Sequence, residues 1–336
     1  MYNIIYACND GYAKLAGISL YSLLKNNPCS KFRVFVMCDN VSEKNAEKLS
    51  SLKTDFGNLQ DLVFVESSAI VSELKSFVKG YDNSIDAAAG GGYTVYARLF
   101  FEKFVPGDVE RIVYIDCDTL VVGDIAPLFS LDMKDSPIAM SYDCTNAKYK
   151  RVINFPEELP YFNSGVLVLD IKNWKEAGCL ARLMDEIHKG VSYPFPDQDF
   201  LNICLRGNIA KYSFRYNFCS AFFLYKSARA VSFIFGLKNF LPLQDDYRDS
   251  AKNPVIFHFN GNTFTRPWFK NSVHPMKKLY DSYYFSSPWK DEEQKSFSMP
   301  RVYKLQYVLW RFTPRFFFYL CSRILQDIFF KMYYKI

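Results

Sequence analysis

The sequence lacks the features that mark several large classes of protein. Its nine cysteines include no C-x-x-C pair, and it has only three histidines. No G-x-G-x-x-G follows the first candidate strand and no G-K-S or G-K-T occurs, which argues against a dinucleotide-dependent oxidoreductase and a P-loop NTPase. The N-terminus has none of the regions of a signal peptide. The longest apolar region, residues 218–240, is interrupted by Lys226 and Arg229, so no membrane span is predicted.

Excess positive charge is also missing from most of the chain. The 41 lysines and arginines outnumber the 35 aspartates and glutamates by six. Residues 301–336 hold seven of these basic residues and one acid, so the preceding residues carry 34 charges of each sign. A neutral body argues against a nucleic-acid partner, which would require positive charge spread over a folded face. Because unpaired cysteines favour a reducing compartment, we expect a cytoplasmic location.

What the sequence does contain is an alternation of apolar runs and helical patterns up to about residue 260. This alternation predicts an α/β fold with a mainly parallel central sheet flanked by helices. Helical spacing predicts helices over residues 15–24, 94–104 and 173–189, and we expect Ser42 and Asp197 to be the N-caps of two more. The candidate strands are residues 4–7, 32–38, 62–65, 111–115, 136–141, 164–169 and 254–259.

Two segments interrupt this alternation. Residues 86–92 contain only aspartate, alanine and glycine, which predicts a flexible stretch. After residue 280 the composition changes to proline, serine, lysine and aromatic residues. We therefore predict a main domain over residues 1–280 and a C-terminal extension over residues 281–336.

A pair of aspartates follows the most regular candidate strand. Four of the five residues 111–115 are apolar, and Asp116 and Asp118 stand just after them. Ligands of open α/β sheets gather at the carboxyl ends of strands, and two such carboxylates can both reach Mg²⁺ or Mn²⁺. The pattern alone is unspecific, because D-x-D recurs at residues 197–199 and two solvated turn aspartates would give the same sequence.

Two further residues offer chemistry that suits a metal and a phosphate. His258 stands near the end of the last candidate strand, and on its own would more often be a core histidine bonded to backbone. With the two aspartates it forms a ligand set that suits Mn²⁺ better than Mg²⁺, because imidazole is a softer ligand than carboxylate. Arg266 offers a planar donor that matches phosphate, although a surface arginine beside a turn would look the same.

Seven segments, in order, resemble family 8 of the retaining glycosyltransferases, the family of glycogenin and of bacterial lipopolysaccharide galactosyl- and glucosyltransferases. The resemblance covers residues 1–270, and two positions depart from the family pattern. Asn9 stands where members often have an acid, and Arg266 where many have lysine. The matching segments are residues 4–12, 19–24, 96–99, 113–119, 161–167, 197–202, and 258–261 with 266–268.

The resemblance implies a GT-A fold that binds a UDP-sugar, with galactose or glucose as the sugar. Tyr12 would stack on uracil, and Arg98, Gly261 and Arg266 would line the phosphates and the sugar. Asp116, Asp118 and His258 would be the metal ligands for Mn²⁺, with Mg²⁺ as an alternative. The donor-binding residues that it implies are Ala7, Asn9, Tyr12, Arg98, Asp116, Cys117, Asp118, Asn163, Ser164, Gly261 and Arg266.

For the reaction, the resemblance implies that Asn163, Ser164, Asp197 and Gln198 face the transferred sugar and that Asp143 lies near the acceptor. Retention of configuration would follow from front-side attack guided by the leaving phosphate. Two displacements, with a carboxylate or the Gln198 amide as nucleophile, would give the same outcome, and the sequence leaves both open. A binding or scaffold protein that keeps the fold without turnover is the main alternative function.

The C-terminal tail, residues 301–336, alternates basic and aromatic side chains. Pro314 predicts a break between two helices, and charged residues recur at four-residue intervals from Arg323 to Lys335. This pattern is typical of a helix that lies on an anionic membrane surface, and the alternative is a helix packed on the enzyme core. With the resemblance, it leads us to expect an enzyme peripheral to the inner face of the membrane, acting on a lipid-linked saccharide such as lipopolysaccharide.

Overall fold

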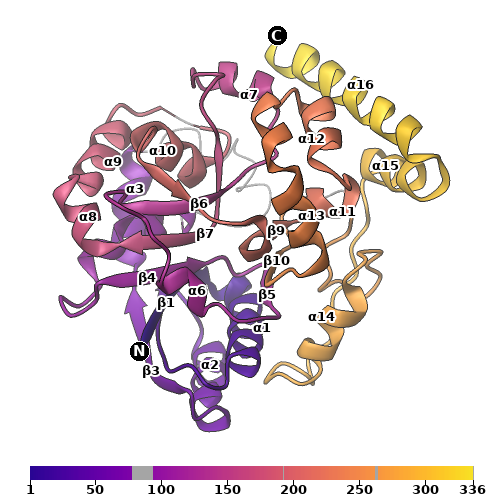
Figure 1. Ribbon diagram of the computed structural model, residues 1–336. Coiled ribbons are helices and arrows are strands. Elements are labelled where there is room, and N and C mark those ends of the chain that lie inside the picture. The colour runs from indigo at the N-terminus through magenta and orange to yellow at the C-terminus, as the bar shows by residue number, and fades with distance from the viewer. Residues whose placement is uncertain (78–93, 192, 262–263, 336) are drawn as a thin grey trace. The chain divides into compact units, whose positions relative to one another are not determined.

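A computed structural model describes residues 1–77, 94–191, 193–261 and 264–335 (Figure 1). The stretch predicted to be flexible, residues 86–92, lies outside them. The chain forms two compact units, each assembled from separate stretches. Unit 1 comprises Met1–Ser141, Phe162–Tyr212 and Ser287–Trp289, and unit 2 comprises Tyr142–Tyr161, Ser213–Ser286 and Lys290–Ile336.

Unit 1 is built on a seven-stranded sheet with the strand order β3-β2-β1-β4-β7-β6-β8. The pairs β1–β2, β2–β3, β1–β4 and β6–β8 are parallel, whereas β4 and β7 are antiparallel. The predicted α/β class and the mainly parallel sheet are thus confirmed. The strands are β1 Tyr2–Asn9, β2 Phe32–Asp39, β3 Leu59–Glu66, β4 Arg111–Ile115, β6 Ile138–Tyr142, β7 Phe162–Asp170 and β8 Ile209–Lys211, with the short β5 Thr119–Val121 outside this sheet.

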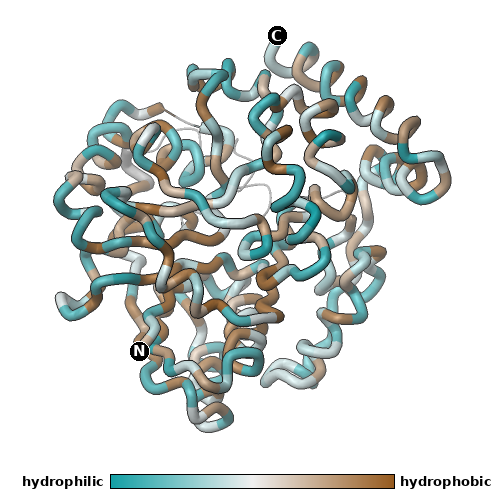
Figure 2. Tube along the Cα trace, in the orientation of Figure 1, coloured by the Kyte–Doolittle hydropathy of each residue, from teal (hydrophilic) through white to brown (hydrophobic). Residues whose placement is uncertain are grey.

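Helices cover both faces of this sheet. Right-handed connections through β1, β2 and β3 put α1 and α2 on one face, and Figure 1 shows α8, α9 and α10 on the other. The central strands β1, β4 and β7 are buried between these layers, and brown predominates in this region of Figure 2. The helices are α1 Asp10–Asn26, α2 Glu43–Asp55, α3 Ser68–Phe77, α5 Thr94–Ala97, the 3₁₀ helix η2 Arg98–Lys103, α6 Ala126–Phe129, α8 Ile171–Glu176, α9 Cys179–His188 and α10 Pro196–Cys204.

Helix boundaries correct two of the predictions. The helix expected over residues 173–189 is two helices, α8 and α9, because Gly178 takes a φ of +60° and lets the chain turn. Asp197 is not the N-cap of α10; Phe195 is, and Pro196 occupies the first helical turn, where its missing N–H costs nothing. Ser42 does cap α2, as predicted.

A short segment beyond residue 280 belongs to unit 1. The Trp289 ring is completely buried there, and its Nε1 donates to Asn45 Oδ1 at 3.2 Å. A Cβ on Gly17 of α1 would lie 2.0 Å from this ring, so only glycine fits beside it. The two units therefore do not divide the chain at a single point, and the boundary at residue 280 stays a prediction.

Unit 2 is mainly helical and has an aromatic core. Its parallel pair β9–β10 places His258 opposite Cys219, and the Phe214 ring packs against those of Phe222 and Tyr247 at 5.1 and 5.6 Å. The elements are α7 Ala147–Val152, the 3₁₀ helix η3 Phe214–Tyr216, β9 Phe218–Cys219, α11 Ala221–Leu224, α12 Ala228–Phe235, the 3₁₀ helix η4 Lys238–Leu243, α13 Gln244–Lys252, β10 Ile256–His258, α14 Lys277–Tyr284, α15 Arg301–Phe312 and α16 Arg315–Tyr334.

The C-terminal tail forms two helices that break at Pro314, as predicted. One face of α16 packs within unit 2, where the Phe318 ring stacks on Tyr225 at 5.9 Å and Arg323 donates to the Phe233 carbonyl at 2.9 Å. Other apolar side chains stay exposed, and Figure 2 shows brown recurring along the whole of α16. No helix among the described residues has the length and apolar character to cross a membrane.

Candidate active site

The two aspartates after β4 lie at the carboxyl end of a strand that is buried on both faces. Asp116 and Asp118 are half-buried, and each has a carboxylate oxygen within 4.8 Å of the other's. The backbone between them is fixed, because the Asp116 N–H donates to the Gly165 carbonyl at 2.8 Å and Thr119 Oγ1 donates to the Asp116 carbonyl at 2.8 Å. Both carboxylates are therefore held on one turn at the sheet edge.

Arg98 links this turn to α10 through two carboxylates. Its Nη1 lies 2.6 Å from Asp116 Oδ1 and 3.4 Å from Asp197 Oδ2, and the side chain is 8% exposed. A buried arginine needs such partners, because an unpaired charge away from water is costly. Arg98 was expected to line the phosphates; in this structure its guanidinium holds Asp116 and Asp197 together.

Tyr114 completes the contacts of Asp116, and sequence reasoning missed it. Its hydroxyl donates to Asp116 Oδ1 at 2.6 Å, and its ring lies 4.5 Å from the Arg98 guanidinium. Burial raises the pKa of this hydroxyl well above its usual value of 10, so the hydroxyl stays protonated and donates. The available signal was a tyrosine inside an apolar strand, since a buried hydroxyl needs a hydrogen-bond partner.

Gln198 joins α10 to β7. Its Oε1 accepts hydrogen bonds from Asn163 Nδ2 at 3.0 Å and from the Ser164 N–H at 3.1 Å. The structure therefore brings together three residues that the resemblance assigned to the sugar. Asn202, which sequence reasoning missed, reinforces the junction by bonding both the N–H and the carbonyl of Phe162 at 2.8 Å.

Asp197 is almost fully buried at this junction. Its Oδ2 accepts no hydrogen bond from the described residues. The same oxygen forms an ion pair with Arg98 Nη1 at 3.4 Å. A buried acceptor that lacks a hydrogen bond costs about 1–3 kcal/mol in a folded protein. Such an oxygen is well suited to accept a hydrogen bond from a hydroxyl group of a bound ligand.

The residues expected at the uridine lie at the end of β1. Asn9 is the N-cap of α1, where its Oδ1 accepts the Tyr12 N–H at 3.1 Å, and Tyr12 is half-buried. The Ala7 carbonyl accepts from the Cys117 thiol at 3.2 Å. The Cys117 side chain is therefore directed into unit 1, and only its backbone could contact a donor.

In unit 2, His258 stands at the end of β10 and is 3% exposed. Its Nδ1 lies 2.9 Å from Asn217 Oδ1. Because an amide oxygen only accepts, this contact calls for a proton on Nδ1, which leaves Nε2 of the neutral ring as the nitrogen that could bind a metal. Sequence reasoning missed Asn217, because nothing in the sequence near His258 indicates a partner that lies 41 residues away.

The remaining predicted residues also belong to unit 2. Gly261 has a φ of +76°, which favours glycine, and Asp143 Oδ1 accepts from Thr145 Oγ1 at 2.7 Å. The Arg266 guanidinium lies 5.3 Å from the Trp268 ring centre. Burial, and then the charge of Arg266, lower the pKa of His274 from 6.5 to about 3, so this buried histidine is neutral.

Comparison with known proteins identifies the family. Residues 3–272 match the model of glycosyl transferase family 8. The chain belongs to this family. It is 25% identical to general stress protein A of Bacillus subtilis, over 85% of this chain and 94% of that protein. It is 24% identical to a lipopolysaccharide 1,2-glucosyltransferase of Escherichia coli K12, over 91% of this chain and 84% of that protein.

Solved structures confirm the GT-A fold of this family 8 chain. The galactosyltransferase LgtC in complex with donor and acceptor sugar analogs matches with a TM-score of 0.66 at 21% identity. The match covers 90% of this chain and 99% of LgtC. A structure of WbbM, a bifunctional glycosyltransferase, gives a TM-score of 0.68 at 20% identity, over 87% of this chain and 50% of WbbM.

Replacing Arg98 with methionine should destabilise unit 1. The substitution leaves Asp116 and Asp197 without their cation, and breaking a buried pair in this way costs about 3–5 kcal/mol. Arg33→Met is the matched control, because Arg33 pairs with Asp108 at 3.0 Å on an exposed carboxylate and such pairs contribute about 1 kcal/mol or less. Urea unfolding measures both free energies, and equal losses would contradict this account of Arg98.

Proposed function

We propose that this family 8 member transfers a hexose, galactose or glucose, from a UDP-sugar to a saccharide acceptor with retention of configuration. The observation that carries the proposal is the buried polar cluster of Arg98, Asp116, Asp197, Gln198 and Asn163. Folded proteins bury so many polar side chains together only where their hydrogen bonds are satisfied or a ligand completes them. The unsatisfied Asp197 oxygen suits a sugar hydroxyl.

The donor set fits a divalent cation. Asp116 and Asp118 supply hard carboxylate oxygens close together, and His258 supplies an Nε2 lone pair because Asn217 holds the proton on Nδ1. We propose that these three side chains bind one Mn²⁺, with Mg²⁺ as the weaker alternative because imidazole is borderline in softness. When bound, the cation would supply Lewis-acid stabilisation of the charge that develops on the diphosphate.

At the nucleotide, we assign base recognition to Asn9 and Tyr12. Asn9 Oδ1 is engaged in capping α1, so the amide nitrogen is the group that we assign to uracil. The half-buried Tyr12 ring, in the first turn of α1, suits stacking on the base. We assign Gly261 and Arg266 to the phosphates, where a guanidinium matches two oxygens at once.

At the sugar, we assign positioning to Arg98 and hydroxyl binding to Asp197. Gln198 Oε1 already accepts two hydrogen bonds, which lowers its reactivity as a nucleophile. Between the two routes that the sequence leaves open, this favours front-side attack, with the leaving phosphate guiding the acceptor. Asp143 is the carboxylate that we assign to the acceptor hydroxyl.

We also propose that the acceptor is lipid-linked, as in lipopolysaccharide, and that the enzyme works at the cytoplasmic face of a membrane. Among the relatives are lipopolysaccharide glucosyltransferases, and the tail offers apolar area to a bilayer. The side chains of Phe312 and Phe316 are 75% and 76% exposed. Large exposed aromatic residues beside basic ones are typical of interfacial helices.

Replacing Asp118 with alanine should reduce turnover at least about 100-fold by removing a metal ligand, because changing a residue that only orients a ligand already costs about 10–100-fold. Release of UDP from a panel of UDP-sugars with Mn²⁺ measures the activity and identifies the donor. Asp132→Ala, an exposed aspartate of the same unit, is the control and should leave turnover unchanged. Near-normal turnover of the Asp118 variant would overturn the metal assignment, and UDP binding without any turnover by the unmodified protein would favour the scaffold alternative.

Replacing Asn217 with leucine should weaken metal binding without removing a ligand. The His258 ring would lose the acceptor that fixes its tautomer, so the Mn²⁺ concentration for half-maximal binding should rise about 10- to 100-fold. Mn²⁺ binding followed by electron paramagnetic resonance tests this directly, with the exposed Asn253→Leu as control. Unchanged Mn²⁺ affinity in a folded Asn217 variant would exclude this role.

Replacing Phe312 and Phe316 together with serine should weaken membrane binding at least about tenfold, since burying one such side chain contributes about 1.5–3 kcal/mol. These substitutions are sharper than deleting residues 301–336, which would also uncover Tyr225. Cosedimentation with lipid vesicles measures binding. Phe285→Ser, which replaces another exposed phenylalanine of unit 2, is the control. An equal loss in the control would contradict the assignment.

A further inference from the structure

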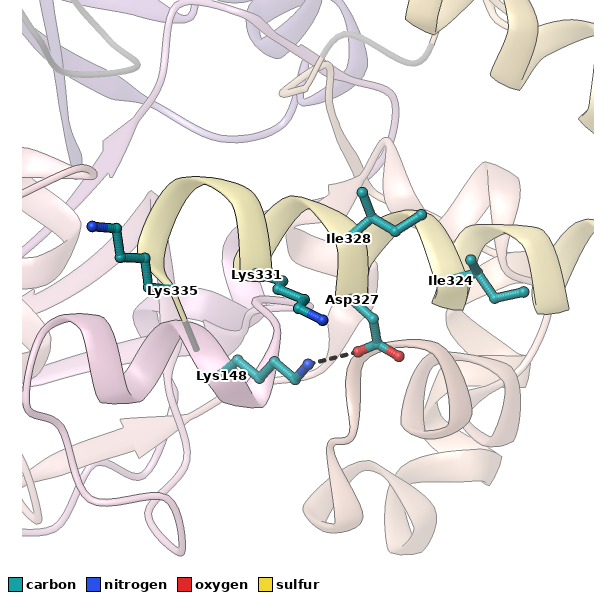
Figure 3. Close-up of a pocket in the computed structure, with 6 residues that line it drawn as sticks. All are labelled: Lys148, Ile324, Asp327, Ile328, Lys331 and Lys335. Carbon is teal, nitrogen blue, oxygen red and sulfur yellow. Dashed lines mark hydrogen bonds and ion pairs between the residues drawn. The ribbon is translucent and has the colours of Figure 1, made fainter.

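Unit 2 contains a groove between α7 and the C-terminal half of α16 that the proposed reaction does not use. Its volume is about 700 Å³. Figure 3 shows Lys148 of α7 directed toward Asp327 and Lys331 bending toward the same point, whereas Lys335, at the end of α16, is directed away from them. This lysine groove is lined by Lys148, Ile324, Asp327, Ile328, Lys331 and Lys335.

The lysine groove carries more positive charge than its own carboxylate can balance. Lys148 Nζ pairs with Asp327 Oδ1 at 2.8 Å. Within the part of the chain that the structure describes, no carboxylate lies within ion-pair distance of Lys331 or Lys335. The three lysines that line the groove therefore outnumber its one lining acid, Asp327, and this excess of positive charge favours an anionic ligand.

An apolar stripe runs beside these lysines. Ile324 and Ile328 are 48% and 47% exposed. With Phe317 and Leu320, also exposed, they recur every three or four residues and so share one face of α16. A ligand that covers both the lysines and this stripe must be anionic at one end and apolar at the other.

We propose that the lysine groove binds the phosphate headgroup of an anionic phospholipid, with its acyl chains against the stripe of Phe317, Leu320, Ile324 and Ile328. This inference rests on the proposed membrane association and specifies its partner. It also differs from a diffuse basic tail, because Arg323 is turned to the Phe233 carbonyl and Asp327 to Lys148, while Lys148 comes from a distant part of the sequence.

The test is cosedimentation of the full chain with vesicles of phosphatidylcholine alone or with added phosphatidylglycerol. Lys331→Gln with Lys335→Gln should reduce partitioning onto the anionic vesicles roughly 30-fold, given about 1 kcal/mol for each lysine at such a surface. Lys238→Gln with Lys252→Gln is the control, because it removes the same charge from exposed lysines of unit 2. It should change partitioning less than about threefold. Asp327→Asn should increase partitioning, because it removes the one acid among the described residues that line the groove.

The outcomes distinguish headgroup binding in the lysine groove from membrane association in general. If the Phe312 and Phe316 variant loses binding while the Lys331 and Lys335 variant retains it, the groove assignment falls and membrane association stands. If the unmodified chain binds no vesicle, both fall, although UDP release would still test the transferase. Equal losses in groove and control variants would show diffuse attraction and overturn the groove.

Two other occupants would overturn the proposal. One is a free anion. If inorganic phosphate releases the protein from the vesicles at the same concentration as glycerol phosphate and soluble lipid headgroups do, the groove is a site for free anions. A second copy of the chain on the stripe would appear as a dimer in sedimentation velocity that Ile324→Ser dissociates. UDP release with a soluble acceptor should be the same in every groove variant, which confirms that each is folded.

Discussion

The polar cluster of unit 1 depends on the ion pairs that Arg98 forms with two carboxylates. Asp116 comes from the turn after β4 and Asp197 from the first turn of α10, and Arg98 in η2 is the cation that contacts both. Burying one carboxylate near another is unfavourable unless a positive charge lies between them. Because of Arg98, a strand end and a helix that are distant in sequence can present acids in one place. The arginine therefore acts through the two aspartates that it positions.

The same logic extends to the neutral side chains. Gln198, Asn163 and Asn202 use amide groups to bond backbone and one another, so α10 and the start of β7 hold a fixed relation without any charge. In unit 2, Asn217 does for His258 what Tyr114 does for Asp116, by fixing the orientation of a group that would bind a ligand. Side chains that orient ligating groups are as important for affinity as the ligands themselves.

Sequence reasoning predicted those parts of the candidate site that a short stretch of sequence encodes. The apolar strand of residues 111–115 followed by Asp116 and Asp118 is visible because strand and acids are adjacent. Asn202 and Asn217 were missed because their partners lie 40 and 41 residues away. The N-cap of α10 was placed wrongly because Pro196 begins the helix earlier than the first aspartate. The local sequence pattern thus predicts helices, strands and the polar residues at their ends. The hydrogen-bond partners of residues that are distant in sequence can be identified only from the structure.

The charge pattern of the tail does not predict which way its charged side chains face. A regular series from Arg323 to Lys335 predicts one charged stripe facing one partner. In the structure Arg323 bonds a helix end and Asp327 pairs with Lys148, so the members of the series serve different contacts. What faces outward beside the remaining lysines is apolar. Two of the seven basic residues of the tail, Lys331 and Lys335, therefore line one groove together with Lys148 from the otherwise neutral body. Concentration of charge in a groove favours one bound headgroup over a film of counter-ions.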